Sequence, residues 1–314
     1  MRTGSISNLF LRCQKHVLFK LTIAFIFLCC LDFIFGTIVR YFYFRQTSGP
    51  EFVTTYSMTK TNADVLIFGS SRANHHYHPE VFEQNLKMSC YNTGRDGLGI
   101  VYNYALLKAI LGRYIPKIVI LDLNSDEFHK SKGNYDKLSV LLPYYHSYPE
   151  IRKLVDLKSK FEKFKMLSHI YPYNSTLSYI ILGNTKYNQK RRNEINGYVP
   201  LMTEWTGSLE TVSNYDNYEL DPDIILLYEA FIRDCCNAKI KTYIIHSPYY
   251  AKINYLDKSI EIGQKIAKKY NVPFYDFSND TAFLNHPKLF SDLSHLNNEG
   301  AIKFSKIVLE DVIH

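Results

Sequence analysis

The sequence predicts an α/β protein built on a doubly wound, five-stranded parallel sheet and preceded by one transmembrane helix. Short apolar runs alternate with segments of helical pattern along the 314-residue chain. Each apolar run ends in a turn rich in glycine or polar residues, as strand–helix units of a parallel sheet do. Hydrophobic residues make up 46% of the chain, which is enough for a sizeable core and too apolar for a disordered chain.

The first predicted strand, residues 65–68, is a continuous apolar run, as expected for a strand covered on both faces. It leads without a polar break into Gly69-Ser70-Ser71-Arg72. In a sheet of strand order 2-1-3-4-5 the ends of the first three strands are neighbours, so their turns would surround this one. The further strands are predicted at 88–91, 117–124, 241–248 and 272–276, and helices at 79–86, 101–111, 223–237, 257–270 and 301–312.

Residues 130–220 interrupt the alternation of strands and helices. They are rich in Tyr, Lys and Asn, and helical patterns occur near 147–168. A loop of that length without structure is uncommon, so we expect a mainly helical insertion within a domain of residues 63–314. Residues 40–62 are expected to be a polar and aromatic connector into that domain.

A membrane-spanning signal anchor is predicted at residues 21–39. These 19 residues contain one charge, Asp32, and at about 1.5 Å per residue they extend about 28 Å, enough to cross a bilayer core. Asp32 costs about 3 kcal/mol near the centre, which the surrounding Phe, Ile and Leu outweigh. No Ala-x-Ala-like cleavage site follows, and neither Cys29 nor Cys30 has the small residue before it that a lipoprotein needs.

The basic residues within 1–20 favour a cytoplasmic N-terminus. The chain would then be a single-pass protein of the cytoplasmic (inner) membrane, with its large domain facing the periplasm or the cell exterior. The formal net charge is +7, but the densest basic cluster, Lys190-Arg191-Arg192, is too short for a nucleic-acid arm. No nucleic-acid partner is therefore expected, and a solvated basic surface explains the charge.

Ser71 is a candidate nucleophile because it follows the carboxyl end of a buried strand, where parallel sheets place their chemistry. The same turn would also serve simply as a helix N-cap. A serine nucleophile needs a base, and the base needs an orienting acceptor. Asp292 and His295 are three residues apart near the C-terminus and can meet within one turn. They could equally be a helix cap and a surface histidine.

An oxyanion site needs hydrogen-bond donors beside the nucleophile. Gly97, in the loop after the second strand, and Asn124, after the third, are in suitable places. Arg72 would either hold a substrate group or pair with a core carboxylate such as Asp122. His246, at the end of the fourth strand, would either line the pocket or be a satisfied core histidine.

Histidines 75, 76 and 78 follow the Gly-Ser-Ser turn, but adjacent histidines point in different directions and no carboxylate partner is evident. We therefore expect no metal and no cofactor. The glycine loop at 94–99 lacks the lysine of a P-loop and the spacing of a dinucleotide fingerprint.

At these positions the sequence resembles the SGNH/GDSL hydrolase superfamily, whose sheet has the flavodoxin-like strand order. The family has a Gly-Asp-Ser block with the nucleophile, an asparagine five residues before the oxyanion glycine, a Gly-x-Asn-Asp block, and an Asp-x-x-His block. A full or partial counterpart of each block occurs here in order, at a predicted strand end or near the C-terminus. The matching residues are Gly69, Ser71, Asn92, Gly97, Asn124, Asp292 and His295.

The resemblance covers roughly residues 63–130 and 220–312 and has departures. Ser70 stands where the family usually has an aspartate, and Asp122 and Ser125 replace the outer residues of the third block. The resemblance implies a serine esterase or O-acyltransferase with a Ser-His-Asp catalytic triad. Membrane-anchored relatives with a Gly-Ser-Ser-Arg turn act in acylation or deacylation of cell-surface polysaccharides.

The implied partners are an acylated carbohydrate or acyl donor, with acetyl as the expected group, and polysaccharide-assembly proteins. The alternative is a catalytically decayed module of the same fold that binds polysaccharide or an assembly partner at the membrane. The departures at Ser70, Asp122 and Ser125 favour that alternative.

Overall fold

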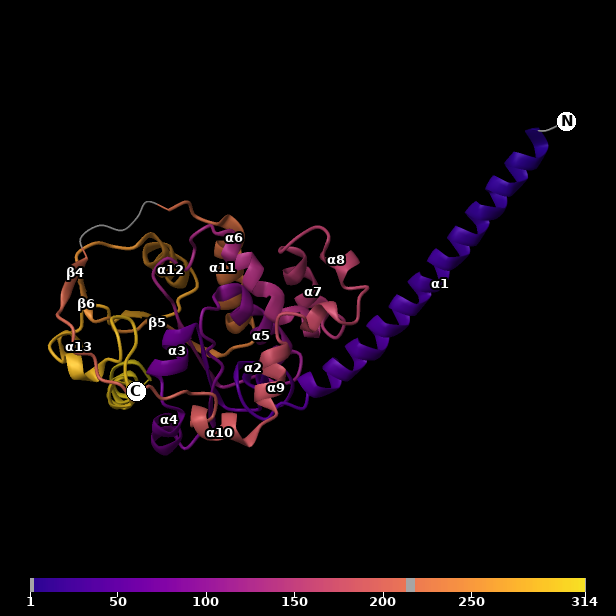
Figure 1. Ribbon diagram of the computed structural model, residues 1–314. Helices are drawn as coiled ribbons and strands as arrows, with labels where there is room; N and C mark the ends of the chain where they lie inside the picture. Colours follow the sequence, from indigo (N-terminus) through magenta and orange to yellow (C-terminus); the bar gives the residue numbers. More distant parts are fainter. Residues whose placement is uncertain (1–2, 213–217, 314) are drawn as a thin grey trace.

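The computed structural model describes residues 3–212 and 218–313 (Figure 1). One long helix, α1 (Thr3–Tyr43), projects from the remainder of the chain, which folds around a parallel sheet. Within α1, the stretch Gln14–Tyr43 is long and apolar enough to cross a membrane. Most of its large hydrophobic side chains are exposed, as those of a membrane helix would be in the absence of lipid.

The sheet has the order β2-β1-β3-β5-β7, and every neighbouring pair is parallel. This confirms the predicted doubly wound five-stranded sheet. When these five strands alone are numbered in the order in which the chain forms them, their order across the sheet is 2-1-3-4-5. β1 and β3 are buried throughout, as their continuous apolar sequences indicate. The five strands are β1 (Val65–Phe68), β2 (Cys90–Asn92), β3 (Ile118–Asp122), β5 (Lys241–His246) and β7 (Phe274–Asp276).

Helices cover both faces of the sheet, and the side chains of β1 alternate between two apolar cores. Leu66 and Phe68 belong to one core, with residues of α5 and α11. Val65 and Ile67 belong to the other, with residues of α4 and α14. The helices of this framework are α3 (Ser71–His76), α4 (Pro79–Leu86), α5 (Ile100–Leu111), α11 (Pro222–Asn237), α12 (Lys258–Lys269), α13 (Thr281–Leu284), η3 (Pro287–Leu289), α14 (Asn298–Ile307) and η4 (Val308–Ile313).

The expected connector at residues 40–62 is in part a buried helix, α2 (Pro50–Thr59), which packs on α5. Its Glu51 forms an ion pair with Arg95 at 2.7 Å, and both side chains are buried. Arg95 belongs to the loop that follows β2. The connector therefore holds that loop in place instead of acting only as a tether.

The insertion is helical, as predicted, up to residue 192. A short strand then follows, β4 (Glu210–Val212), which pairs in parallel with β6 (Ala251–Ile253) and which the sequence did not indicate. The insertion helices are α6 (Lys132–Asp136), η1 (Lys137–Tyr144), α7 (Pro149–Asp156), α8 (Glu162–Lys165), η2 (Tyr171–Tyr173), α9 (Leu177–Gly183) and α10 (Lys186–Arg192). Of these helices, η2 and α9 contact α1.

Candidate active site

Ser71 is the first residue of α3, directly after the turn that ends β1. Gly69 makes this turn at φ 144, and a Cβ there would lie 2.7 Å from the Cβ of Ala73 and 2.9 Å from the carbonyl oxygen of Asp122. Only glycine fits such a position. Ser70 occupies the N-cap position of α3, but its side chain makes no capping hydrogen bond. The turn therefore brings Ser71 to the carboxyl edge of the sheet without using either serine as a cap.

A chain of hydrogen bonds joins Ser71, His295 and Asp292. The Ser71 Oγ lies 2.8 Å from Nε2 of His295. The Nδ1 of His295 lies 2.9 Å from both carboxylate oxygens of Asp292. Because a carboxylate only accepts, Nδ1 carries the proton, and Nε2 is left to accept the hydroxyl proton of Ser71. The structure thus brings Ser71 to the pair Asp292 and His295, which lies more than two hundred positions further along the sequence.

The Asp292 carboxylate also accepts hydrogen bonds from the backbone N–H groups of Ser294, at 2.7 Å, and His295, at 2.9 Å. Partial burial opposes ionisation, but the hydrogen bonds from His295 and Ser294 outweigh it and lower the pKa of Asp292. Asp292 therefore remains a carboxylate near neutral pH and keeps orienting the imidazole.

His76, which the sequence raised only as a metal ligand, anchors the loop that carries His295. Its Nε2 accepts the backbone N–H of Leu296 at 3.0 Å, so the proton is on Nδ1, which donates to Ser247 Oγ at 2.9 Å. Burial, together with the Arg72 guanidinium, holds the pKa of His76 well below its usual range. His76 is thus neutral and able to accept a hydrogen bond. Helix α3 therefore carries both Ser71 and His76, which anchors the loop of His295.

Asn92 fixes the other end of α3. Its side-chain amide donates to the carbonyl oxygens of Ala73, at 2.7 Å, and Tyr77, at 3.0 Å. The side-chain oxygen of Asn92 accepts the N–H of Gly94 at 2.9 Å. The loop after β2 is therefore tied to the helix that begins at Ser71.

Gly97 and Asn124 line one cavity of about 240 Å³ together with Ser70. Gly97 has φ 71, and nothing lies within 4 Å of where its Cβ would be, so it faces open space. The Asn124 amide nitrogen donates to Ser70 Oγ at 2.6 Å and to Glu127 Oε2 at 3.3 Å. A substrate oxygen would have to replace one of these partners. The oxyanion role of Gly97 and Asn124 stays a prediction.

Glu127 is a titratable group on the wall of this cavity that the sequence did not single out. Its carboxylate accepts the N–H of Ile100 at 2.6 Å, at the start of α5. Burial raises the pKa of Glu127 to about 7, against the effect of that hydrogen bond. The native state therefore binds this proton more tightly than the unfolded chain, and stability is lost as the pH rises from about 4.5 to about 7.

Replacing Glu127 with Gln is expected to remove this pH dependence. Gln keeps an acceptor for the Ile100 N–H and cannot ionise. The free energy of unfolding of the variant, relative to the wild type, should rise by about 1–3 kcal/mol between pH 4.5 and pH 8. Thermal and chemical unfolding of the two proteins across that range measures the difference. A difference that is constant with pH would show that Glu127 titrates normally.

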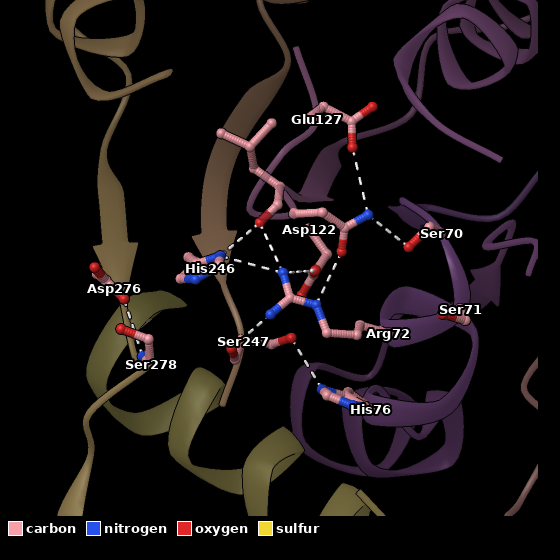
Figure 2. A network of polar contacts seen from close by, with 12 residues as sticks. Ser70, Ser71, Arg72, His76, Asp122, Glu127, His246, Ser247, Asp276 and Ser278 are labelled. Atoms are coloured by element: carbon pink, nitrogen blue, oxygen red, sulfur yellow. Dashed lines mark hydrogen bonds and ion pairs between the residues drawn. The ribbon is translucent and has the colours of Figure 1, made fainter. Parts of the chain in front are cut away.

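Arg72 lies at the centre of a buried network beneath the strand ends (Figure 2). It is 3.3 Å from Asp122 in the ion pair that the sequence offered as one of two possibilities. Its guanidinium donates to the carbonyl oxygens of Leu123, at 2.8 Å, and Ser247, at 3.0 Å, and Nε donates to Asn124 Oδ1 at 2.9 Å. Arg72 thereby sets the direction of the Asn124 amide.

The sequence left two roles open for Arg72 and His246, and the structure favours the structural role over substrate binding, because both side chains are buried and committed to the protein. His246 Nδ1 is 2.7 Å from the Leu123 carbonyl oxygen and 3.1 Å from Arg72 Nη2. Arginine only donates, and the carbonyl only accepts, so Nδ1 donates to Leu123. Burial, reinforced by Arg72, lowers the pKa of His246 to about 3, and the ring is neutral at neutral pH. Arg72 and His246 are positioning residues beneath the site.

The fold and the site together define a class: a doubly wound α/β protein with a serine–histidine–aspartate hydrogen-bond chain at the carboxyl edge of its sheet. No protein-family model and no curated protein sequence matches the chain. Several solved structures are similar to it, among them two at low identity. An acetyl xylan esterase is 14% identical, with 79% of this chain and 99% of that chain covered and a TM-score of 0.39.

A protein assigned to the G-D-S-L lipolytic family, from Desulfitobacterium hafniense DCB-2, is 12% identical. The match covers 77% of this chain and 96% of that chain, with a TM-score of 0.34. At such distances the activity of this chain has to be inferred from its own site.

Proposed function

We propose that the chain is a membrane-anchored serine esterase or O-acyltransferase of the SGNH/GDSL type. The observation that carries this proposal is the contact of 2.8 Å between Ser71 Oγ and His295 Nε2, with Asp292 at 2.9 Å from the other ring nitrogen. A nucleophile, a base within hydrogen-bond reach and an acceptor that orients the base are the parts that acyl transfer requires.

In the proposed reaction, His295 Nε2 takes the hydroxyl proton as Ser71 Oγ forms a bond to the ester carbonyl carbon. The tetrahedral intermediate collapses when the C–O bond of the ester breaks and His295 returns the proton to the leaving alcohol. Water, or a sugar hydroxyl, then loses a proton to His295 and attacks the acyl-enzyme. The acid or the new ester leaves, and Ser71 recovers its proton.

The developing oxyanion is proposed to be held by the backbone N–H groups of Ser71 and Gly97 and by the amide of Asn124. Two features support this role. Gly97 faces an open cavity that Asn124 also lines, and Arg72 fixes the direction of the Asn124 amide from below. Ser70 Oγ holds the amide nitrogen at 2.6 Å until substrate arrives.

The proposed substrate is an O-acetylated polysaccharide at the cell surface or in export. Its support is the resemblance of the Gly69-Ser70-Ser71-Arg72 turn to membrane-anchored relatives and an N-terminal helix that is long enough to span a bilayer. We propose that this helix anchors the protein in the cytoplasmic membrane, with the enzyme domain on the periplasmic or exterior side. Polysaccharide-assembly proteins are proposed as its neighbours there.

The proposal is tested by labelling the full-length protein, in detergent, with a fluorophosphonate probe that reacts only with activated serines. We expect labelling of the wild type, mapping to Ser71, and release of acetate from acetylated polysaccharide. His295→Ala should lose the labelling, because Ser71 then lacks its base. A folded wild-type protein that the probe does not label would overturn the proposal and leave the non-catalytic binding module in its place.

A further inference from the structure

The stretch of α1 that enters the large domain is held by the tip of the insertion, defined here as residues 158–170. The Asp32 carboxylate, the one acidic group of the apolar segment, accepts three hydrogen bonds from this tip. The donors are Ser168 Oγ and the His169 N–H, both at 2.6 Å, and the Ile170 N–H at 3.3 Å. From the sequence alone, Asp32 is only an unfavourable charge in a membrane segment, whereas in the structure Asp32 has a specific partner, the insertion tip.

The same contact is tightly packed. A Cβ at Gly36 would lie 2.4 Å from the carbonyl carbon and the Cβ of His169, so the two backbones approach as closely as glycine permits. The ring of Phe33 meets the ring of His169 edge to face, with centroids 4.9 Å apart. Helix α1 and the insertion tip therefore form one packed unit at this level.

The position of this contact along α1 sets the depth of the tip. Asp32 and Gly36 lie seven and three residues before the end of the apolar segment 21–39. At about 1.5 Å per residue, the contact is about 5–10 Å inside the end of that segment. A loop hydrogen-bonded to Asp32 is therefore at the depth of the headgroups and the upper acyl chains.

The outer surface of the tip has the composition of an interfacial segment. Phe161, Phe164 and Leu167 recur every third residue, and all three are exposed. Lys160 and Lys163 each place the ammonium group 5.1 Å from the ring centroid of the phenylalanine that follows. Apolar side chains with adjacent lysines suit the boundary between acyl chains and anionic headgroups.

The single acidic residue of the tip is withdrawn from this surface. Glu162 is buried, and its carboxylate accepts from Lys165 Nζ and from Tyr171 O–H, each at 2.7 Å. The surface that remains is apolar and basic. On a soluble protein such exposed apolar groups would need a partner, and the neighbouring α1 identifies the partner as lipid.

We propose that the insertion tip is seated in the bilayer leaflet from which α1 emerges. This inference rests on the proposed membrane anchoring of α1. Two elements then hold the domain at a fixed height and orientation on the membrane, where a single helix would leave it free to swing. The substrate would accordingly be a polymer presented close to the membrane surface.

The experiment uses tryptophan fluorescence, because Trp205 is the one tryptophan of the chain. In a Trp205→Phe background, tryptophan is introduced at Leu167 or at Met202, two side chains that are each 76% exposed. Met202 is a matched control because it lies elsewhere in the domain, away from the insertion tip. The carbonyl oxygen of its neighbour Leu201 accepts the N–H of Asn298, at the start of α14. A third variant, Phe25→Trp, reports on α1 itself. Each full-length protein is reconstituted in phosphatidylcholine–phosphatidylglycerol vesicles whose acyl chains carry bromine, a quencher of tryptophan.

We expect the Leu167→Trp and Phe25→Trp proteins to lose most of their emission in brominated vesicles, and the Met202→Trp protein to keep it. Quenching at Phe25 without quenching at Leu167 would overturn the seated tip while leaving the anchor intact. Quenching at neither position would overturn both. The fluorophosphonate labelling of each variant is recorded separately, so that a failure of the proposed enzyme activity is distinguishable from a failure of the membrane contact.

Discussion

Ser71→Ala is expected to lower kcat/KM for a chromogenic acetyl ester by a factor on the order of 10⁴ to 10⁶, since in the proposed mechanism Ser71 forms the acyl-enzyme. The circular dichroism and unfolding temperature should stay close to those of the wild type. Ser71 is partly exposed, and among the described residues its hydroxyl hydrogen-bonds only to His295. Steady-state kinetics on the full-length protein in detergent, with fluorophosphonate labelling alongside, measures the effect.

Ser70→Ala is the matched control, because it removes the same hydroxyl one residue earlier. Ser70 Oγ accepts from the Asn124 amide at 2.6 Å, and its loss frees that amide without removing a reacting atom. One hydrogen bond of about 1 kcal/mol corresponds to a change of less than about tenfold. A larger loss for Ser70→Ala than for Ser71→Ala would show that the nucleophile has been assigned to the wrong serine.

The sheet and the Ser71 turn were predictable because their signals are local. A buried parallel strand reads as an unbroken apolar run, and Gly69 marks the point where the chain must turn under Asp122 and Ala73. Asp292 and His295 were also predictable as a pair, since three residues separate them and one turn brings them together. The structure adds that this pair meets Ser71.

The support of the site was not predictable, because its contacts join distant parts of the chain. His76 accepts the N–H of Leu296 across 220 positions, and no local pattern distinguishes such a buried histidine from an exposed one. The tip that binds Asp32 is 136 residues away from it in sequence. Sequence position showed that Arg72 and His246 lie at strand ends, but side-chain direction decides whether such residues face substrate or core.

Arg72→Met is expected to destabilise the protein by about 3–5 kcal/mol, because it leaves the fully buried Asp122 carboxylate without its cation. The variant also removes the donor of the Ser247 carbonyl oxygen and leaves the Leu123 carbonyl oxygen with His246 Nδ1 as its donor. Burial raises the pKa of Asp122, despite the charge of Arg72 and the hydrogen bond from Tyr77. Uptake of a proton by Asp122 should therefore recover part of the lost free energy of unfolding at low pH. A group whose pKa is raised in the native state stabilises that state below its pKa, so the variant should differ less from the wild type at low pH than at neutral pH.

Three further variants separate the buried ion pair from a general effect of losing arginine. Arg233→Met removes a half-exposed arginine on α11 and should change the free energy of unfolding by no more than about 0.5 kcal/mol. Adding Asp122→Asn to Arg72→Met should cost less than the sum of the two single changes, since the unpaired charge is then absent. Chemical unfolding in one detergent compares the wild type, the three single variants and the double variant. Arg72→Met could instead have the same free energy of unfolding as the wild type and only a higher KM. Arg72 would then face the substrate, and the buried network would not be what holds the carboxyl edge of the sheet together.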